Sequence, residues 1–177
     1  HNKVDDYLII NGTDTPPLNE LFGKVNWDIL SNGDPVIFHG DFHFENIIYN
    51  KKLDKFYFLD WRQNFGGIKE YGDIYYDFAK LYHGLIVNHS IINQDLYSVK
   101  WEKNKCKFDF HRKNILVNCE EYFKGWLESK NYSFNKVELI TSLIFLNIAP
   151  LHHYPYSEML FLLGKYMLFR NIHKDDF

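Results

Sequence analysis

The chain has 177 residues, of which 46% are hydrophobic and 19% aromatic, and this is enough to bury a sizeable core within one domain. Its formal net charge is −3 at pH 7, and its 20 Lys and Arg residues are scattered along the sequence. Because there is no basic stripe, the electrostatic footprint of a nucleic-acid binder is missing, and nucleic acid is not expected as a partner.

Residues 1–34 are predicted to form an irregular lead-in that contains one short helix. The first residues are polar and include the pair Pro16-Pro17, which favours a loop. We interpret His1 as the remnant of a tag. The short helix is predicted over residues 18–30, and residues 35–177 are predicted to be the main domain.

A β-hairpin is predicted between residues 46 and 60. Ile47–Tyr49 and Phe56–Leu59 are β-branched and aromatic runs, and the polar residues between them favour a turn. An antiparallel hairpin returns the chain to its starting end. Asn46, before the first strand, and Asp60, after the second, are therefore expected to lie close together.

The residues around this hairpin suit magnesium and phosphate chemistry. The carbonyl of Asn46 and the carboxylate of Asp60 are hard oxygen donors of the kind that Mg²⁺ accepts, with phosphate oxygens and waters completing the octahedron. Asp41 lies in the loop that leads into the hairpin. From there it is expected to orient or deprotonate a substrate hydroxyl while the metal holds nucleotide phosphates.

Helices are predicted for most of the remaining sequence. Apolar residues recur at helical spacing from Asp73 onwards, and this helix is expected to pack beneath the loop of Asp41. Residues 88–110 show no clear period, and the charged stretch 100–107 is interpreted as a solvated excursion. Further helices are predicted over residues 111–130, 135–151 and 157–172, with Ser133 and Ser157 as N-terminal caps.

Cysteine content and hydropathy indicate the compartment. Cys106 and Cys119 have no CxxC spacing, which fits reduced thiols. The longest apolar run, near residues 139–150, is too short to span a bilayer, and no signal-like stretch is present. We therefore expect a soluble, cytoplasmic protein with no membrane partner.

Three segments resemble the motifs of a known enzyme group. HGDFHFEN at residues 39–46 resembles the HxDxxxxN catalytic loop of the aminoglycoside phosphotransferase, choline kinase and fructosamine kinase group, which has the protein-kinase-like fold. FLDW at residues 58–61 resembles that group's metal-binding Asp segment, and GDIYYDFA at residues 72–79 resembles its GDPxYDLA stretch. The resemblance covers about residues 35–85. It implies an α+β, mainly helical fold, the carboxy-terminal lobe of the kinase-like fold, in which a short β-hairpin carries the catalytic and metal-binding residues.

The resemblance also implies an activity. The protein would transfer the terminal phosphate of ATP or GTP, with Mg²⁺ as cofactor, to a hydroxyl of a small molecule such as a choline-like amino alcohol, an amino sugar or a sugar. The roles carried over are Asp41 as catalytic base, His39 as the residue that shapes the catalytic loop, Asn46 and Asp60 as magnesium and nucleotide ligands, Asp77 as a buried acceptor that braces the loop, and Asp73 as a supporting position.

The kinase-like template has a second lobe that is not visible in this sequence. That amino-terminal lobe binds the nucleotide through a Gly-rich flap, a Lys and its Glu partner. We therefore expect this chain to be a shortened or cleaved product that is inactive without its missing lobe. Phe44 and Glu45 replace residues that are commonly Pro or Gly in the group, and Arg62 stands where an acidic residue often follows the Trp. These departures leave the chemistry intact and obscure the substrate.

Alternative interpretations remain open from the sequence. Asp41 would serve as a turn cap, Asn46 as a hydrogen-bonding loop residue and Asp60 as a strand end in a non-catalytic kinase-like binding or scaffolding module. In an extended segment, His39, Asp41 and His43 would also point to one face and could hold a transition metal in a hydrolase. No matching downstream cluster of ligands supports that last alternative.

Overall fold

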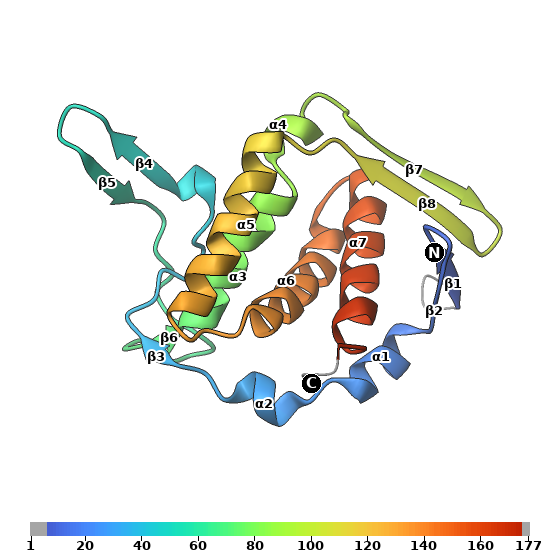
Figure 1. The fold of residues 1–177 in the computed structure, drawn as a ribbon, viewed down its shortest axis with the longest axis horizontal. Helices are drawn as coiled ribbons and strands as arrows, with labels where there is room; N and C mark the ends of the chain where they lie inside the picture. The colour runs from blue at the N-terminus through green and yellow to red at the C-terminus, as the bar shows by residue number, and fades with distance from the viewer. Residues whose placement is uncertain (1–6, 175–177) are drawn as a thin grey trace.

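The computed structural model describes residues 7–174, which form an α+β fold that is about half helical (Figure 1). Its body is built from four long helices, α3 (Ile74–Ile86), α5 (Asn114–Ser129), α6 (Phe134–Ile148) and α7 (Tyr156–Asn171). Helix α6 packs against both α3 and α7, and α5 lies along α3. The helical body therefore supports α3, the helix that follows the third motif.

The four predicted long helices are confirmed, with a difference at one cap. Ser133 caps α6 as predicted, because its side chain accepts a hydrogen bond from the backbone N–H of Lys136. The predicted cap Ser157 is wrong. Helix α7 begins one residue earlier, at Tyr156, and Pro155 at its N-terminus makes no side-chain cap.

Over its described residues, 7–34, the lead-in is not irregular, contrary to the prediction; His1, interpreted as the remnant of a tag, lies outside the described residues. Strands β1 (Leu8–Ile10) and β2 (Thr13–Thr15) form a hairpin, and β1 pairs in parallel with β8 (Lys105–Phe110). Strand β7 (Tyr97–Glu102) completes a four-stranded sheet of order β2-β1-β8-β7. The stretch interpreted as a solvated excursion is thus the turn of the β7–β8 hairpin and its flanking strands (Figure 1).

The first helical segment is also split in two. Helix α1 covers Leu18–Lys24 and helix α2 covers Trp27–Ser31. Val25 between them adopts extended backbone, and Asn26 caps α2 by accepting a hydrogen bond from the N–H of Ile29. The remaining short helices are α4 (His89–Ile92), the 3₁₀ turn η1 (Phe44–Asn46) and the 3₁₀ turn η2 (Ala149–Leu151).

One large apolar cluster joins the helices to the sheet. It includes Phe78 and Leu85 of α3, Phe145 of α6, Leu160 of α7 and Phe108 of β8. A smaller cluster, formed by Leu21, Val25, Leu139 and Leu168, fixes α1 onto α6 and α7. The first cluster buries one face of α3, so α3 is a fixed support for the loop packed against it.

One stretch of the described residues, Phe134–Leu151, is long and apolar enough to cross a membrane by length and composition alone. It corresponds to α6 with η2. A core helix of a globular domain passes the same test, and here Val137, Ile144 and Phe145 of this stretch are buried in the large apolar cluster.

Cys106 is buried, Cys119 is exposed, and both are free thiols.

Candidate active site

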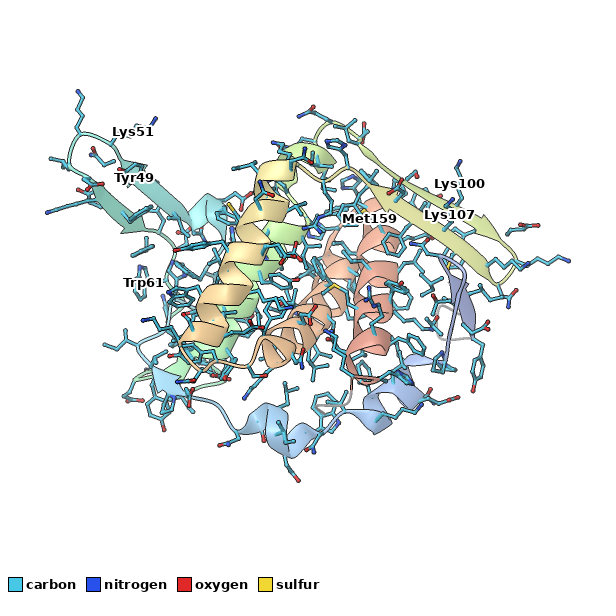
Figure 2. The ribbon with its side chains drawn as sticks, viewed as in Figure 1. Tyr49, Lys51, Trp61, Lys100, Lys107 and Met159 are labelled. Carbon is cyan, nitrogen blue, oxygen red and sulfur yellow. The ribbon has the colours of Figure 1, made fainter. Side chains whose placement is uncertain are left out.

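The loop of the first motif lies between two short ladders. Strand β3 (Pro35–Val36) pairs with β6 (Gly72–Asp73) before the loop, and η1 leads from the loop into β4 (Ile47–Asn50), which pairs with β5 (Lys55–Phe58). The predicted hairpin is therefore present. It projects away from the helical body, with Tyr49 and Lys51 near its outer end (Figures 1 and 2).

The carboxylate of Asp77, on α3, binds backbone N–H groups of the loop. Its two carboxylate oxygens accept hydrogen bonds from the backbone N–H of His39 at 2.6 Å and of Gly40 at 2.7 Å. Burial raises the pKa of Asp77 above its ordinary value, and the two backbone hydrogen bonds oppose that rise. This is the contact expected of a buried acceptor beneath the loop.

Gly40 is required at the centre of the loop. Its φ of +79° lies in the left-handed region that side chains disfavour. A Cβ at this position would also lie 2.6 Å from the Cβ of Arg62. The absence of a side chain therefore allows the segment after β5 to pass close to the loop, where the N–H of Arg62 donates to the carbonyl of His39 at 2.9 Å.

Asp41 is held between two cationic side chains. Its Oδ1 lies 2.7 Å from Nζ of Lys80, and its Oδ2 accepts a hydrogen bond from Arg62 at 2.7 Å. Burial opposes ionisation, but the hydrogen bond and charge of Lys80, with the charges of His43 and Arg62, hold the pKa of the Asp41 carboxyl below its ordinary value. The side chain is 14% exposed. Asp41 is thus an ionised carboxylate that remains in contact with solvent.

Sequence reasoning missed Lys80. Lys80 lies three residues after Asp77 on α3, a spacing that puts both side chains on neighbouring parts of the helix surface. Because Asp77 is predicted to lie beneath the loop, this spacing could have predicted that the ammonium group of Lys80 lies close to Asp41. Arg62 was noted only as a departure from the motif, although it supplies the second cation.

Asn46 and Asp60 lie at the same end of the β4–β5 ladder. The N–H of Leu59 donates to the carbonyl of Asn46 at 2.9 Å, which places Asp60 one residue beyond that contact. The Asn46 amide donates to the backbone carbonyl of Asp41 at 3.0 Å, so its nitrogen is engaged at the loop. Asp60 is exposed and has a φ of +54°. Such backbone is uncommon outside glycine and is often found at functional sites.

Asn46 and Asp60 carry the type of side-chain oxygen that Mg²⁺ accepts. Over residues 7–174, no side chain donates a hydrogen bond to Oδ1 of Asn46, and the carboxylate of Asp60 forms no ion pair. Two hard oxygen donors are thus available at one end of the hairpin. An ion held there would take its other ligands from phosphate and water, as Mg²⁺ commonly does.

His39 contributes to the site by packing. It is 4% exposed, and its ring lies against the ring of Trp61 at a centroid distance of 4.9 Å and that of Phe42 at 5.5 Å. Its Nδ1 accepts the N–H of Asp41 at 3.3 Å, and its buried Nε2 has no partner in the described part of the chain. This geometry fixes the shape of the loop and leaves His39 out of contact with the Asp41 carboxylate.

Asp73 has a local role at the start of α3. Its carboxylate accepts hydrogen bonds from the N–H of Tyr75 at 3.0 Å and of Asp34 at 3.2 Å. It therefore caps α3 and fixes the segment that enters the loop. Among the described residues, Asp73 forms no hydrogen bond or ion pair with the Asp41 carboxylate.

Asp41 is also close to a chain of paired histidine and glutamate side chains. Glu45 pairs with His43 at 2.8 Å and with His89 at 3.2 Å, and His43 lies 3.7 Å from Asp41. Among residues 7–174, no group of three or more His, Cys, Asp and Glu side chains is arranged to hold a metal ion. The alternative of a His39–Asp41–His43 transition-metal centre therefore finds no support, since His39 is turned into the aromatic packing.

A cleft of about 510 Å³ opens beside Lys80. Lys80 and Tyr76 belong to its lining, and burial, followed by the charge of Asp41, raises the pKa of Tyr76. Its walls are largely apolar and come from α2, α6 and the loop after Asp60; they include Leu30, Phe65 and Ile144. The lining of this cleft includes Lys80, so the cleft lies next to the Lys80–Asp41 ion pair.

Comparison of the chain with family models, with curated protein sequences and with solved structures gives no match. The link to the kinase-like group therefore depends on the three sequence motifs and on the geometry described above.

Proposed function

We propose that this chain is the catalytic lobe of a magnesium- and nucleotide-dependent phosphotransferase that acts on a hydroxyl group of a small molecule. The observation that supports it best is the meeting of three segments at one place: the Asp41 loop fixed by Asp77, Asn46 at the entry of the hairpin, and Asp60 at its exit. Phosphoryl transfer needs mainly positioning and charge neutralisation, and this set of residues is suited to both.

In this proposal Asp41 orients the acceptor hydroxyl more than it removes its proton. A carboxylate whose pKa is depressed is a weak base, so it accepts the proton late, as the bond to phosphorus forms. Asn46 and Asp60 would hold Mg²⁺, which supplies charge neutralisation on the nucleotide phosphates when bound. Lys80 and Arg62 add positive charge where negative charge develops on the transferred group.

The cleft beside Lys80 is the proposed acceptor site. Most of its lining is apolar, and its one carboxylate, Asp73, is already engaged as the cap of α3. A polycationic aminoglycoside would find no free counter-charge there. The lining favours a small alcohol with an apolar part.

The exposed hairpin is the proposed contact for a nucleotide-binding lobe. Six of its apolar side chains are 41–61% exposed: Ile48, Tyr49, Leu53, Phe56, Tyr57 and Phe58. A two-stranded hairpin alone is marginally stable in water, and a large exposed apolar patch commonly marks an interaction surface.

A second candidate is a non-catalytic kinase-like binding or scaffolding module. The observation that favours it is that both oxygens of Asp41 are already paired, with Lys80 and with Arg62. An acceptor hydroxyl would have to share the carboxylate with these cations.

A turnover assay on the full-length protein separates the two candidates. The protein is supplied with Mg²⁺, ATP or GTP, and a panel of amino alcohols, amino sugars and sugars, and nucleoside diphosphate release is followed. Asp41→Asn should lower turnover by about a hundredfold or more. Asp14→Asn, at an exposed position of strand β2, is the matched control. Turnover that Asp41→Asn does not reduce contradicts the mechanism, and no turnover with any acceptor favours the binding module.

A further inference from the structure

A row of four side chains, His89, Glu45, His43 and Asn46, leads from the surface to the loop of Asp41. Glu45 is contacted at both carboxylate oxygens: its Oε1 lies 3.2 Å from Nδ1 of His89, and its Oε2 lies 2.8 Å from Nδ1 of His43. The other ring nitrogen of His43, Nε2, lies 3.2 Å from the amide nitrogen of Asn46. The side chains of His89 and Glu45 are about half exposed, that of His43 is 18% exposed, and Asn46 is buried.

The Asn46 amide has one orientation that suits its neighbours. Its nitrogen lies 3.0 Å from the backbone carbonyl oxygen of Asp41, which can only accept a hydrogen bond. One proton of the NH₂ group is therefore donated to that carbonyl, and the second proton is available to Nε2 of His43. A flipped amide would bring Oδ1 against the Asp41 carbonyl, acceptor against acceptor. Because oxygen and nitrogen are the two branches of one planar group, these contacts also fix the direction of Oδ1.

The same contacts fix the position of the proton on the His43 ring. Nε2 faces an N–H of Asn46, so Nε2 is the unprotonated nitrogen that accepts. Nδ1 faces the Glu45 carboxylate, which can only accept, so Nδ1 carries the proton. A proton on Nε2 would instead oppose the amide N–H, donor against donor. The distance from Nε2 to Oδ1 of Asp41 is 3.7 Å, which is longer than a hydrogen bond, so the Asp41 carboxylate does not take the place of Asn46.

We propose that Glu45 and His43 are positioning residues that hold the Asn46 amide in this orientation. Glu45 selects the tautomer of His43, and that tautomer accepts a hydrogen bond from Asn46 and so fixes the direction of Oδ1. The orientation follows from the contacts alone, whereas its role rests on the proposed function, in which Oδ1 of Asn46 binds Mg²⁺. Removing a side chain that orients a metal ligand typically weakens metal binding by about 10–100-fold.

The tautomer is tested by long-range ¹H–¹⁵N NMR of the histidine rings in the ¹⁵N-labelled chain at pH 8. His43 should show a protonated Nδ1 and an unprotonated Nε2. Glu45→Ala should shift the proton toward Nε2, because the carboxylate that holds it on Nδ1 is gone. Glu45→Gln should preserve the assigned tautomer, since the amide oxygen of Gln also accepts a hydrogen bond. Glu121→Ala, at an exposed position of α5, is the control and should leave the His43 ring unchanged.

The Asn46 amide is followed in a further variant, His43→Phe, which removes the acceptor Nε2. The side-chain NH₂ resonances of Asn46 should move, and their protons should exchange faster with water. In the nucleoside diphosphate complex of the full-length protein, His43→Phe should also weaken Mn²⁺ binding about tenfold, as measured by EPR. Asn46→Ala should weaken it at least as much, and Glu121→Ala should not change it. If His43→Phe does not fold, Glu45→Ala takes its place in both measurements.

Four results would overturn the proposal. They are a proton on Nε2 of His43 in the unaltered chain, a tautomer that Glu45→Ala does not change, Asn46 NH₂ resonances that do not move in His43→Phe, and Mn²⁺ binding that only Asn46→Ala weakens. A different result would separate the proposed function from this inference. If neither Asn46→Ala nor His43→Phe weakens Mn²⁺ binding while the tautomer and the NH₂ resonances behave as expected, Asn46 is not a metal ligand, and its positioning by His43 and Glu45 stands.

Discussion

Replacing Asp77 by Ala removes the acceptor that two backbone N–H groups of the Asp41 loop share. His39 and Gly40 are both buried, and their N–H groups have no other hydrogen bond described. A buried donor left without a partner costs about 1–3 kcal/mol, so two cost about 2–6 kcal/mol. Removing the carboxylate also relieves the cost of burying it, which is the cause of its raised pKa. We therefore expect a loss of about 3 kcal/mol in the free energy of unfolding.

The assay is urea unfolding at pH 7, followed by circular dichroism, with Asp73→Ala as the matched control. Asp73 also accepts two backbone N–H groups, but it is half-buried at a helix N-terminus, where losing a cap typically costs about 1 kcal/mol. Asp77→Ala should therefore be clearly the more destabilising, and the amide protons of His39 and Gly40 should exchange faster. Equal losses in the free energy of unfolding in the two variants, or unchanged amide exchange in the loop, would show that Asp77 does not hold the loop.

Three further predictions concern the same region. Gly40→Ala should be more destabilising in urea than Gly67→Ala, since both have positive φ but only at position 40 would the new Cβ meet a neighbour within 4 Å; equal losses would argue against the close approach. Burial lowers the pKa of His83 to about 4 from 6.5. Between these values the unfolded chain binds a proton that the folded chain does not, so stability should fall by up to about 3 kcal/mol as the pH drops from 6.5 to 4. His83→Phe should flatten this dependence in urea melts at a series of pH values, and an unchanged slope would contradict the assignment. Lys80→Met should raise the pKa of the Asp41 carboxyl in a ¹³C NMR titration, and an unmoved pKa would show that Lys80 is not the dominant partner.

The parts of the fold that local pattern determines were predictable from the sequence. Helix α3 shows apolar residues at helical spacing, and the β4–β5 hairpin shows two β-branched and aromatic runs around a polar turn. The contact between Asp77 and the loop was also expected, because an aspartate on the buried face of a helix needs nearby donors.

The parts that depend on distant segments were not predictable. Strand β1 has three residues, too few to show alternation, and its partner β8 follows almost a hundred positions later, with Ile10 paired to Cys106. No residue pattern near Leu8 predicts that pairing.

The roles of the candidate site residues stay predictions; part of their arrangement could be predicted from the sequence, but the charges around Asp41 could not. The motifs gave Asp41, Asn46 and Asp60, and the hairpin explains why the last two lie at one end of a ladder. The cations at Asp41 were missed because Lys80 and Arg62 lie in different segments and meet only through the packing of α3 and the passage of the chain over Gly40.

If Asp41, Asn46 and Asp60 serve one cation and phosphate centre, a paramagnetic ion bound there should broaden their NMR resonances. Mn²⁺ replaces Mg²⁺ in the nucleoside diphosphate complex of the full-length protein, and line broadening is measured across its ¹⁵N resonances. We expect broadening at these three residues, lost in Asp60→Ala, with little effect at Asn171 at the end of α7. Broadening confined to other segments, or unchanged in Asp60→Ala, would contradict it.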